Sequence, residues 1–125
     1  MTIIENQFDP TRYAAVRKPL LEAETLPPDA YTSESFFKRE VETIFLKVWN
    51  FVGREDRVPN PGDYAAFEFV GVPVVIVRGR DGRVRAFANS CRHRGAKVMA
   101  GEGNCTVFSC PYHAWTYAID DGRLI

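Results

Sequence analysis

Two cysteines and two histidines of this chain are spaced as metal ligands. Cys91 and His93 form a Cys-x-His motif, sixteen residues follow, and Cys110 and His113 then form a Cys-x-x-His motif. Thiolate sulfur and imidazole nitrogen are ligands that zinc and iron–sulfur centres use in proteins. A gap of one or two residues within each motif lets its two side chains reach different metal ions. The pattern therefore predicts a metal centre held between two short loops.

The distribution of the ligand types between the two motifs favours iron over zinc. Each motif carries one cysteine and one histidine, whereas zinc sites usually pair cysteine with cysteine and histidine with histidine. A Rieske [2Fe-2S] cluster takes two thiolates on one iron and two imidazoles on the other, which fits the mixed motifs. We therefore expect such a cluster on Cys91, His93, Cys110 and His113, and hence one-electron transfer. A structural zinc site on the same residues is the alternative.

Both motifs contain residues that favour fixed turns. The first motif continues to Gly95, which permits a positive φ, and in the second Cys110 is followed by Pro111, which locks φ. The sequence thus predicts two tight ligand loops.

The loop sequences resemble those of a known family, the large (α) subunits of Rieske non-heme iron oxygenases, or aromatic-ring-hydroxylating oxygenases. The resemblance rests on the segments Asn89–Gly95 and Cys110–Tyr117 and runs upstream to near Leu26. It includes the upstream residues Leu26-Pro27, Tyr31, Ile44-Phe45, Trp49 and Gly62-Asp63-Tyr64.

The resemblance also implies a potential at the low end of the Rieske range. High-potential respiratory Rieske proteins carry Gly-Ser after the second histidine and one extra cysteine in each loop, joined as a disulfide. Here Ala114 and Trp115 follow His113, so the serine hydroxyl is missing, and neither loop has the extra cysteine.

In the resembled family a catalytic domain follows, with a mononuclear iron held by two histidines and one carboxylate. The resemblance implies a parent oxidoreductase, a dioxygenase or monooxygenase that uses O₂ and NAD(P)H to oxygenate an organic, aromatic substrate, as in aromatic hydrocarbon catabolism. Its expected partners are a reductase or a ferredoxin as electron donor. The parent is expected to be a homotrimer or an α3β3 assembly.

This chain lacks residues for that second iron site. Its two histidines, His93 and His113, are both assigned to the cluster. After an expected turn at Asp121-Gly122 only three residues remain, fewer than a strand normally has. We therefore expect a C-terminally truncated part of an oxygenase that supplies the electron relay alone, with the catalytic domain absent. The alternative is a stand-alone Rieske-type ferredoxin, which the N-terminal extension disfavours.

Composition excludes several other partners. The 125 residues contain 16 basic and 16 acidic side chains, so the net charge gives no basis for binding nucleic acid or an anionic membrane. The longest apolar stretch, Phe69–Val77, is too short to span a bilayer. Two of the three cysteines belong to the expected cluster, which argues against disulfides and indicates a cytoplasmic location. The third, Cys105, is expected to be a small, partly buried side chain.

The expected fold is mostly β. Residues 1–48 are predicted to form an N-terminal arm and helix, and residues 49–125 a Rieske-type antiparallel β-sandwich with two cluster-binding loops, incomplete at its C-terminal end. Strands are expected over Tyr64–Val70, Val74–Val77, Val84–Ala88, Thr106–Ser109 and Ala114–Ile119, with turns at Asp81-Gly82 and Asp121-Gly122.

A helix is predicted over residues 33–48. Its apolar residues repeat at helical spacing, and Thr32 or Ser33 can cap its start. We expect its apolar face and the following Trp49 to lie in the core.

Charged and aromatic residues flank the expected ligands. Arg92, Arg94 and Lys97 make the first loop basic, either as a docking patch for an acidic ferredoxin or as a solvated face. Tyr112 and Trp115 are expected to shield the cluster or to pack beneath it.

Overall fold

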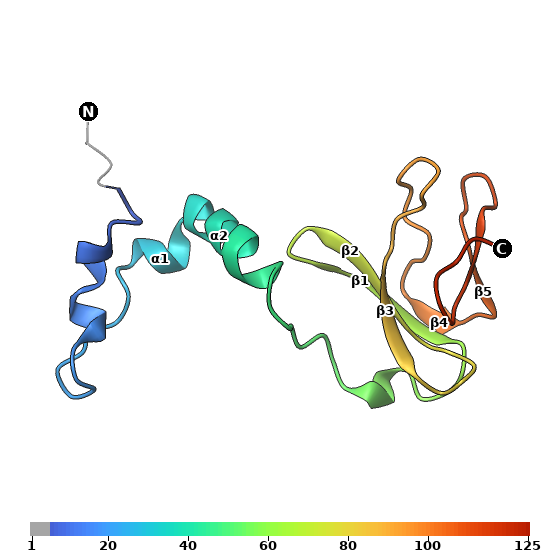
Figure 1. Ribbon diagram of the computed structural model, residues 1–125, viewed down its shortest axis with the longest axis horizontal. Coiled ribbons are helices and arrows are strands. Elements are labelled where there is room, and N and C mark those ends of the chain that lie inside the picture. Colours follow the sequence, from blue (N-terminus) through green and yellow to red (C-terminus); the bar gives the residue numbers. More distant parts are fainter. Residues whose placement is uncertain (1–5) are drawn as a thin grey trace. The chain divides into compact units, whose positions relative to one another are not determined.

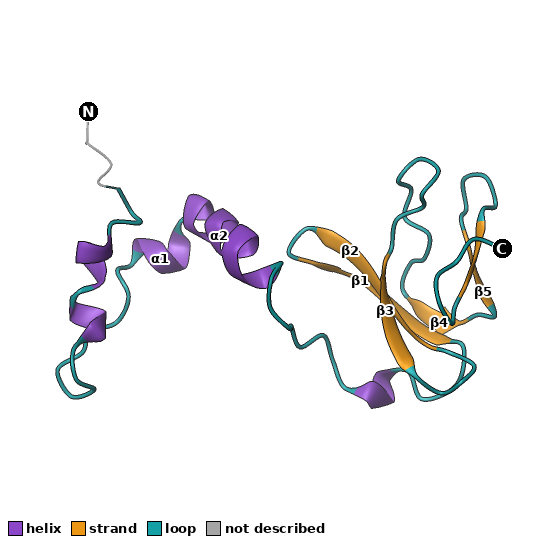
Figure 2. Ribbon diagram, in the orientation of Figure 1, coloured by secondary structure: helices purple, strands orange, loops and turns teal. Residues whose placement is uncertain are grey.

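A computed structural model describes residues 6–125, and the chain divides into two units, Met1–Asn50 and Phe51–Ile125 (Figure 1). The described part of the first unit, residues 6–50, consists of helical segments and loops, and the strands of the described chain lie in the second unit (Figure 2). Within the described residues no helix is long and apolar enough to cross a membrane.

The first unit is a series of short helical segments. Two 3-10 turns, Pro10–Tyr13 and Ala15–Arg17, precede α1 (Asp29–Thr32) and α2 (Glu34–Glu40). Pro19 follows the second turn, and proline is disfavoured inside a helix.

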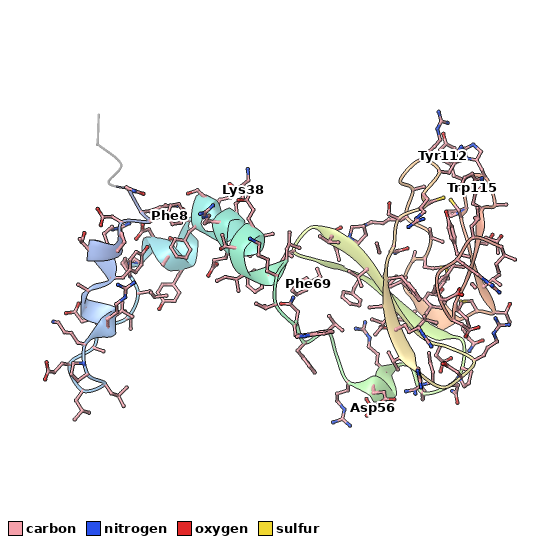
Figure 3. The ribbon with its side chains drawn as sticks, viewed as in Figure 1. Phe8, Lys38, Asp56, Phe69, Tyr112 and Trp115 are labelled. Carbon is pink, nitrogen blue, oxygen red and sulfur yellow. The ribbon has the colours of Figure 1, made fainter. Side chains whose placement is uncertain are left out.

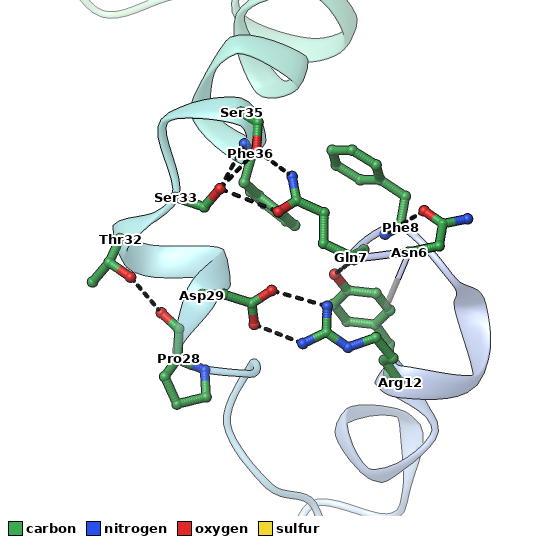
Figure 4. Close-up of polar contacts among 11 residues, drawn as sticks. Asn6, Gln7, Phe8, Arg12, Pro28, Asp29, Thr32, Ser33, Ser35 and Phe36 are labelled. Carbon is green, nitrogen blue, oxygen red and sulfur yellow. Dashed lines mark hydrogen bonds and ion pairs between the residues drawn. The ribbon is translucent and has the colours of Figure 1, made fainter. Parts of the chain in front are cut away.

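Hydrogen bonds tie the start of the described chain to α1 and α2 (Figure 4). The guanidinium of Arg12 donates to both carboxylate oxygens of Asp29, at 2.9 and 2.8 Å. The side-chain amide of Gln7 donates to Ser35 at 2.7 Å and accepts from the Ser33 hydroxyl at 3.1 Å. These bonds hold the arm against the beginning of α2.

The predicted helix begins where expected but is not α-helical throughout. The Ser33 hydroxyl caps α2 by accepting a hydrogen bond from the N–H of Phe36. The α-helix ends at Glu40, and a π-helical turn follows over Val41–Phe45. Thr43 donates its hydroxyl to the carbonyl of residue 39, and such bonding in a β-branched stretch disfavours a regular α-helix.

The expectation of a buried apolar helix face is wrong for this structure. None of residues 6–50 is buried, and Phe37 and Ile44 are about half exposed. Trp49, expected in the core, is fully exposed at 102%. Short helical turns bury little of an apolar stripe, because residues 6–50 contain no sheet or long helix that could pack on it.

The second unit is an antiparallel β structure, as predicted. Strands β1 (Asp63–Phe69), β2 (Val72–Arg78), β3 (Val84–Ala88) and β4 (Glu102–Asn104) form a sheet in the order β3-β2-β1-β4. Strands β5 (Val107–Ser109) and β6 (Thr116–Ala118) form a second, two-stranded sheet. A short 3-10 turn, Glu55–Arg57, precedes β1.

Turn chemistry sets the register of the first sheet. Val70 and Gly71 join β1 to β2 with φ values of 45° and 84°, as a two-residue hairpin turn requires. The predicted turn at Asp81-Gly82 joins β2 to β3, and Gly82 has a φ of 79°. Strand β4 was not predicted, because its residues carry no apolar alternation; it pairs with the start of β1.

The central strand β2 has a different core on each side. Val75 and Val77 contact a cluster that also contains Phe108, Tyr117 and Ile119. Ile76, which points to the opposite face, packs with Val58 and Ala65. The first of these clusters includes the two cysteines Cys91 and Cys110. The fold therefore places the predicted sulfur ligands in the interior.

Candidate metal centre

The two cysteine–histidine loops project from the same end of the second unit (Figure 1). Loop one, residues 91–96, follows β3, and loop two, residues 110–115, connects β5 to β6. A ring contact between His93 and His113 shows that the two loops lie side by side.

The loops have the same backbone hydrogen-bond pattern. In each, the N–H of the cysteine donates to the carbonyl of the residue five positions later, Ala96 or Trp115, at 2.8 Å. The N–H of the residue four positions later donates back to the cysteine carbonyl, at 2.8 Å in loop one and 2.9 Å in loop two. The two motifs are therefore equivalent structural units.

A left-handed residue occupies the fifth position of both loops. In loop one it is Gly95, with a φ of 72°, which confirms the turn expected there. In loop two it is Ala114, with a φ of 58°, although residues with a side chain rarely adopt this conformation. Loop two thus accepts backbone strain to reproduce the geometry of loop one.

The two thiols lie at the inner side of the site. Cys91 and Cys110 are each 3% exposed, and their side chains contact each other. The hydroxyl of Tyr117 lies 3.1 Å from the Sγ of Cys91. This contact lowers the pKa of the Cys91 thiol. The pKa is lowered further by the backbone N–H groups of His93 and Arg94 and by the Cys110 side chain, whereas burial raises it. The site therefore favours thiolate at Cys91.

Tyr117 lies in β6, the strand that follows loop two, and contacts loop one. Its hydroxyl also accepts a hydrogen bond from the backbone N–H of Arg92, at 3.1 Å. The interaction with Cys91 raises the pKa of the Tyr117 phenol, so that this group keeps its proton and can donate it to sulfur. Local sequence patterns do not indicate this role of Tyr117.

The two imidazoles lie at the outer side of the site. His93 and His113 are exposed, and their ring centroids are 4.8 Å apart with 70° between the ring planes. Trp115 stacks on His93 at 4.8 Å and 11°, and Tyr112 lies against His113 at 4.1 Å and 30°. Figure 3 shows Tyr112 and Trp115 at the end of the unit from which the loops project. Both rings therefore lie against the imidazoles, and Tyr112 is 60% exposed.

The four predicted ligands are arranged as two pairs. Among the described residues, no three His, Cys, Asp or Glu side chains converge as they would around one metal ion. Instead the two sulfurs meet in the interior and the two imidazoles meet at the surface. A two-iron cluster with sulfur ligands on one iron and nitrogen ligands on the other requires this separation of donor types. The residues present therefore fit a Rieske cluster.

Asn89 anchors loop one from beneath. It is 2% exposed, and its side-chain oxygen accepts hydrogen bonds from the N–H groups of Val98 and Met99, at 3.1 and 2.8 Å. Its side-chain amide donates to the carbonyl of Met99 at 2.8 Å. The bonds join the end of β3 to the segment that leaves loop one. The sequence signal that could have identified this anchor is a polar residue two positions before the first predicted ligand.

The remaining residues considered from the sequence lie near the site without joining it. Cys105 is partly buried beside the cysteine-containing core, where burial raises the pKa of its thiol. Lys97 forms an ion pair with Glu68 at 3.3 Å. Arg94 lies over the ring of Tyr112, with 6.0 Å between the guanidinium carbon and the ring centroid.

Comparison with protein families gives one family match. The model described as the Rieske [2Fe-2S] domain matches residues 48–125. The match contains both loops and every strand of the second unit.

Known proteins with similar sequences are subunits of oxygenases. The carnitine monooxygenase oxygenase subunit of Escherichia coli K12 is 43% identical over 100 residues, which cover 79% of this chain and 27% of the relative. The biphenyl 2,3-dioxygenase subunit alpha of Rhodococcus jostii is 39% identical over 93 residues, which cover 74% of this chain and 20% of the relative. The chain thus spans about a quarter of the length of these relatives.

A solved structure shows the same fold. A quaternary ammonium Rieske monooxygenase, described in connection with carnitine oxidation and inter-subunit electron transfer, superposes with a TM-score of 0.76 at 42% identity. The alignment covers 82% of this chain and 28% of that protein.

Proposed function

The chain belongs to the Rieske [2Fe-2S] domain family, and on this basis we propose that it is the electron-relay part of a Rieske oxygenase large subunit. The cofactor is a Rieske [2Fe-2S] cluster. The observation that carries the proposal is the separation of the four predicted ligands into a buried sulfur pair and an exposed imidazole pair.

We propose that Cys91 and Cys110 hold one iron and that His93 and His113 hold the other. When bound, the cluster supplies a site that takes up and releases one electron. The buried sulfurs exclude water from the inner side, and the Tyr117 hydroxyl and the backbone N–H groups of loop one donate hydrogen bonds to Cys91. The exposed imidazoles provide the edge at which a redox partner makes contact.

The length of the sequence similarity favours an oxygenase over a stand-alone ferredoxin. The alignment with the carnitine monooxygenase subunit contains more residues than the segment 48–125, so it extends upstream into the arm and helix. We propose that residues 1–48 are this arm and that residues 49–125 are the Rieske domain. A ferredoxin that begins near its first strand would not share the upstream part.

The catalytic step of the parent would take place elsewhere. The chain has two histidines, and both lie at the proposed cluster, so a mononuclear iron with two histidine ligands requires another part of the parent. We propose that this parent is an O₂- and NAD(P)H-dependent oxygenase of the cytoplasm. The relatives include carnitine and biphenyl oxygenases, so this domain type serves both an aliphatic and an aromatic substrate.

The proposed partners are an electron donor and further copies of the parent subunit. A reductase or ferredoxin would deliver electrons at the imidazole edge. The similar quaternary ammonium monooxygenase is described in terms of inter-subunit electron transfer, which supports a multimeric parent. We propose that this multimer is a homotrimer or an α3β3 assembly.

The relay can be tested by a spectroelectrochemical titration of the cluster-loaded chain. We expect reversible uptake of one electron per chain at a potential near the low end of the Rieske range, about −150 mV. The Cys110→Ser variant should lose this signal, because a ligand is removed. Substrate hydroxylation by this chain alone, with a reductase and O₂, would contradict a function limited to electron relay.

A further inference from the structure

The second unit contains a cavity of about 250 Å³ between the end of β3 and the turn that follows β6. Residues of β2 and β5 also line it. The turn packs directly against β3, because a methyl group on Gly122 would come within 2.9 Å of the Phe87 ring. A protein cavity of about 150 Å³ accommodates benzene, so this cavity is large enough for one ring with a short substituent.

The inner part of the cavity is apolar. Its lining includes two valines and three aromatic residues: Val75, Val98, Phe87, Phe108 and Tyr117. Val75, Phe108 and Tyr117 are buried, and the rings of Phe87 and Phe108 meet edge to face with their centroids 6.0 Å apart. These residues favour an apolar occupant over water, because they offer it few hydrogen bonds.

The outer part of the cavity carries a positive charge. Ser90, Arg92 and Asp121 line it and are exposed. Asp121 is compensated by Arg123, which lies 3.6 Å away and donates its backbone N–H to the carboxylate at 3.1 Å. Arg92 forms no ion pair with any of residues 6–125. The charge left uncompensated at this cavity is therefore that of a guanidinium, which favours an anionic ligand.

We propose that the cavity binds a small monocarboxylate whose apolar body is about the size of one ring. The apolar body would lie against the phenylalanine rings, and the carboxylate would accept hydrogen bonds from the guanidinium of Arg92. Guanidinium and carboxylate groups form charge-assisted pairs, often with two parallel hydrogen bonds. None of the four predicted cluster ligands lines the cavity, so this site is separate from the metal centre.

Tyr117 connects the cavity to the proposed cluster. It lines the cavity, and its hydroxyl lies 3.1 Å from the Sγ of Cys91. A carboxylate bound beside Arg92 adds negative charge near the cluster and therefore disfavours reduction. By linkage, the oxidised chain binds the ligand more tightly than the reduced chain. This coupling rests on the proposed function, whereas the binding does not.

The test is a ligand-detected NMR titration of the oxidised, cluster-loaded chain with benzoate, benzyl alcohol and acetate. Benzyl alcohol has the ring without the charge, and acetate has the charge without the ring. Arg92→Gln removes the proposed partner of the carboxylate, and Val98→Phe fills the cavity. Arg94→Gln is the matched control, since it removes an exposed arginine from the same loop but outside the cavity lining.

We expect benzoate to bind with a dissociation constant on the order of 1 mM or lower, and at least about tenfold more tightly than acetate. Arg92→Gln should weaken benzoate binding by about five- to tenfold and leave benzyl alcohol unaffected. Val98→Phe should weaken both ring ligands, and Arg94→Gln should change benzoate binding less than about twofold. The proposal is overturned if benzoate binds no more tightly than acetate, or if the two arginine variants bind benzoate equally well. The arginine comparison decides the matter even if Val98→Phe does not fold.

A redox titration with saturating benzoate tests the coupling. If the oxidised chain binds benzoate about threefold more tightly, the potential should fall by about 30 mV, and Arg92→Gln should reduce this shift. An unchanged potential with benzoate bound would refute the coupling. A chain that binds no cluster would contradict the proposed function and not the cavity, which the benzoate titration of the same chain still decides.

Discussion

The hydroxyl of Tyr117 should raise the reduction potential of the cluster. It lies 3.1 Å from the Sγ of Cys91, and its side chain is buried, so it donates a hydrogen bond in a region from which water is excluded. Reduction adds negative charge to the cluster, and a donor to a ligand sulfur stabilises that charge. The Tyr117→Phe variant removes this donor and keeps the ring in the core.

The size of the effect follows from how much more strongly the hydrogen bond favours the reduced form. If it favours that form by a factor of about three to ten, the one-electron potential of wild type is higher by about 30–60 mV. Tyr117→Phe should therefore lower the potential by that amount. The variant also leaves the backbone N–H of Arg92 without its acceptor, so we expect a lower melting temperature.

The potential can be measured by an EPR-monitored redox titration of the cluster-loaded chain. Tyr64→Phe is the matched control, because it removes a tyrosine hydroxyl that bonds to the carbonyl of Ala100 and not to a ligand. Only Tyr117→Phe should change the potential. If Tyr117→Phe and Tyr64→Phe both titrate at the wild-type potential, the hydrogen bond to Cys91 does not tune the cluster.

Three further substitutions test the positioning of the loops and a fourth tests an ion pair, each by denaturant or thermal unfolding of the cluster-loaded chain. Ala114→Gly should raise the free energy of unfolding by roughly 0.5–1 kcal/mol, since it relieves a left-handed alanine at some entropic cost. Gly95→Ala, at the equivalent position of loop one, should lower the free energy of unfolding by a similar amount, although there is space for the added methyl group. The opposite order would contradict the equivalence of the two loops. Asn89→Ala should cost about 2–3 kcal/mol, because it leaves partly buried backbone groups of Val98 and Met99, just after loop one, unpaired. A neutral result would refute the anchoring role. Hydrogen bonds from the backbone N–H of Arg80, and then from its side chain, hold the pKa of Asp120 below its usual value of 3.8. The ionised carboxylate therefore stabilises the folded state fully above pH 3.8. This contribution is lost as the pH falls through the lowered pKa. Asp120→Asn should therefore reduce stability at pH 7 and flatten the loss of stability below about pH 4, and an unchanged pH profile would contradict this.

The sequence could predict a candidate site because the proposed ligands are local. Each loop contains one cysteine and one histidine within four residues, so the residue types and the turns can be recognised without knowledge of the fold. The hairpin strands were also predictable, since Val84–Ala88 follows an Asp-Gly turn and forms β3 over the same residues.

The supporting contacts could not be predicted in the same way. Tyr117 is 26 residues from Cys91 in the sequence. Arg57 and Glu102, which form an ion pair, are 45 residues apart. Which side chains meet over such separations depends on the strand order, which local patterns do not determine. Trp49 shows the converse error: its apolar character suggested burial, but the described part of the first unit leaves it fully exposed.

The measurement that tests the central claim most directly is the iron, acid-labile sulfide and zinc content of anaerobically purified chain, with an EPR spectrum after dithionite reduction. A Rieske cluster requires two irons and two sulfides per chain and a rhombic signal of low average g. We expect this result. Zinc without sulfide would contradict the account and would make the four residues a structural zinc site.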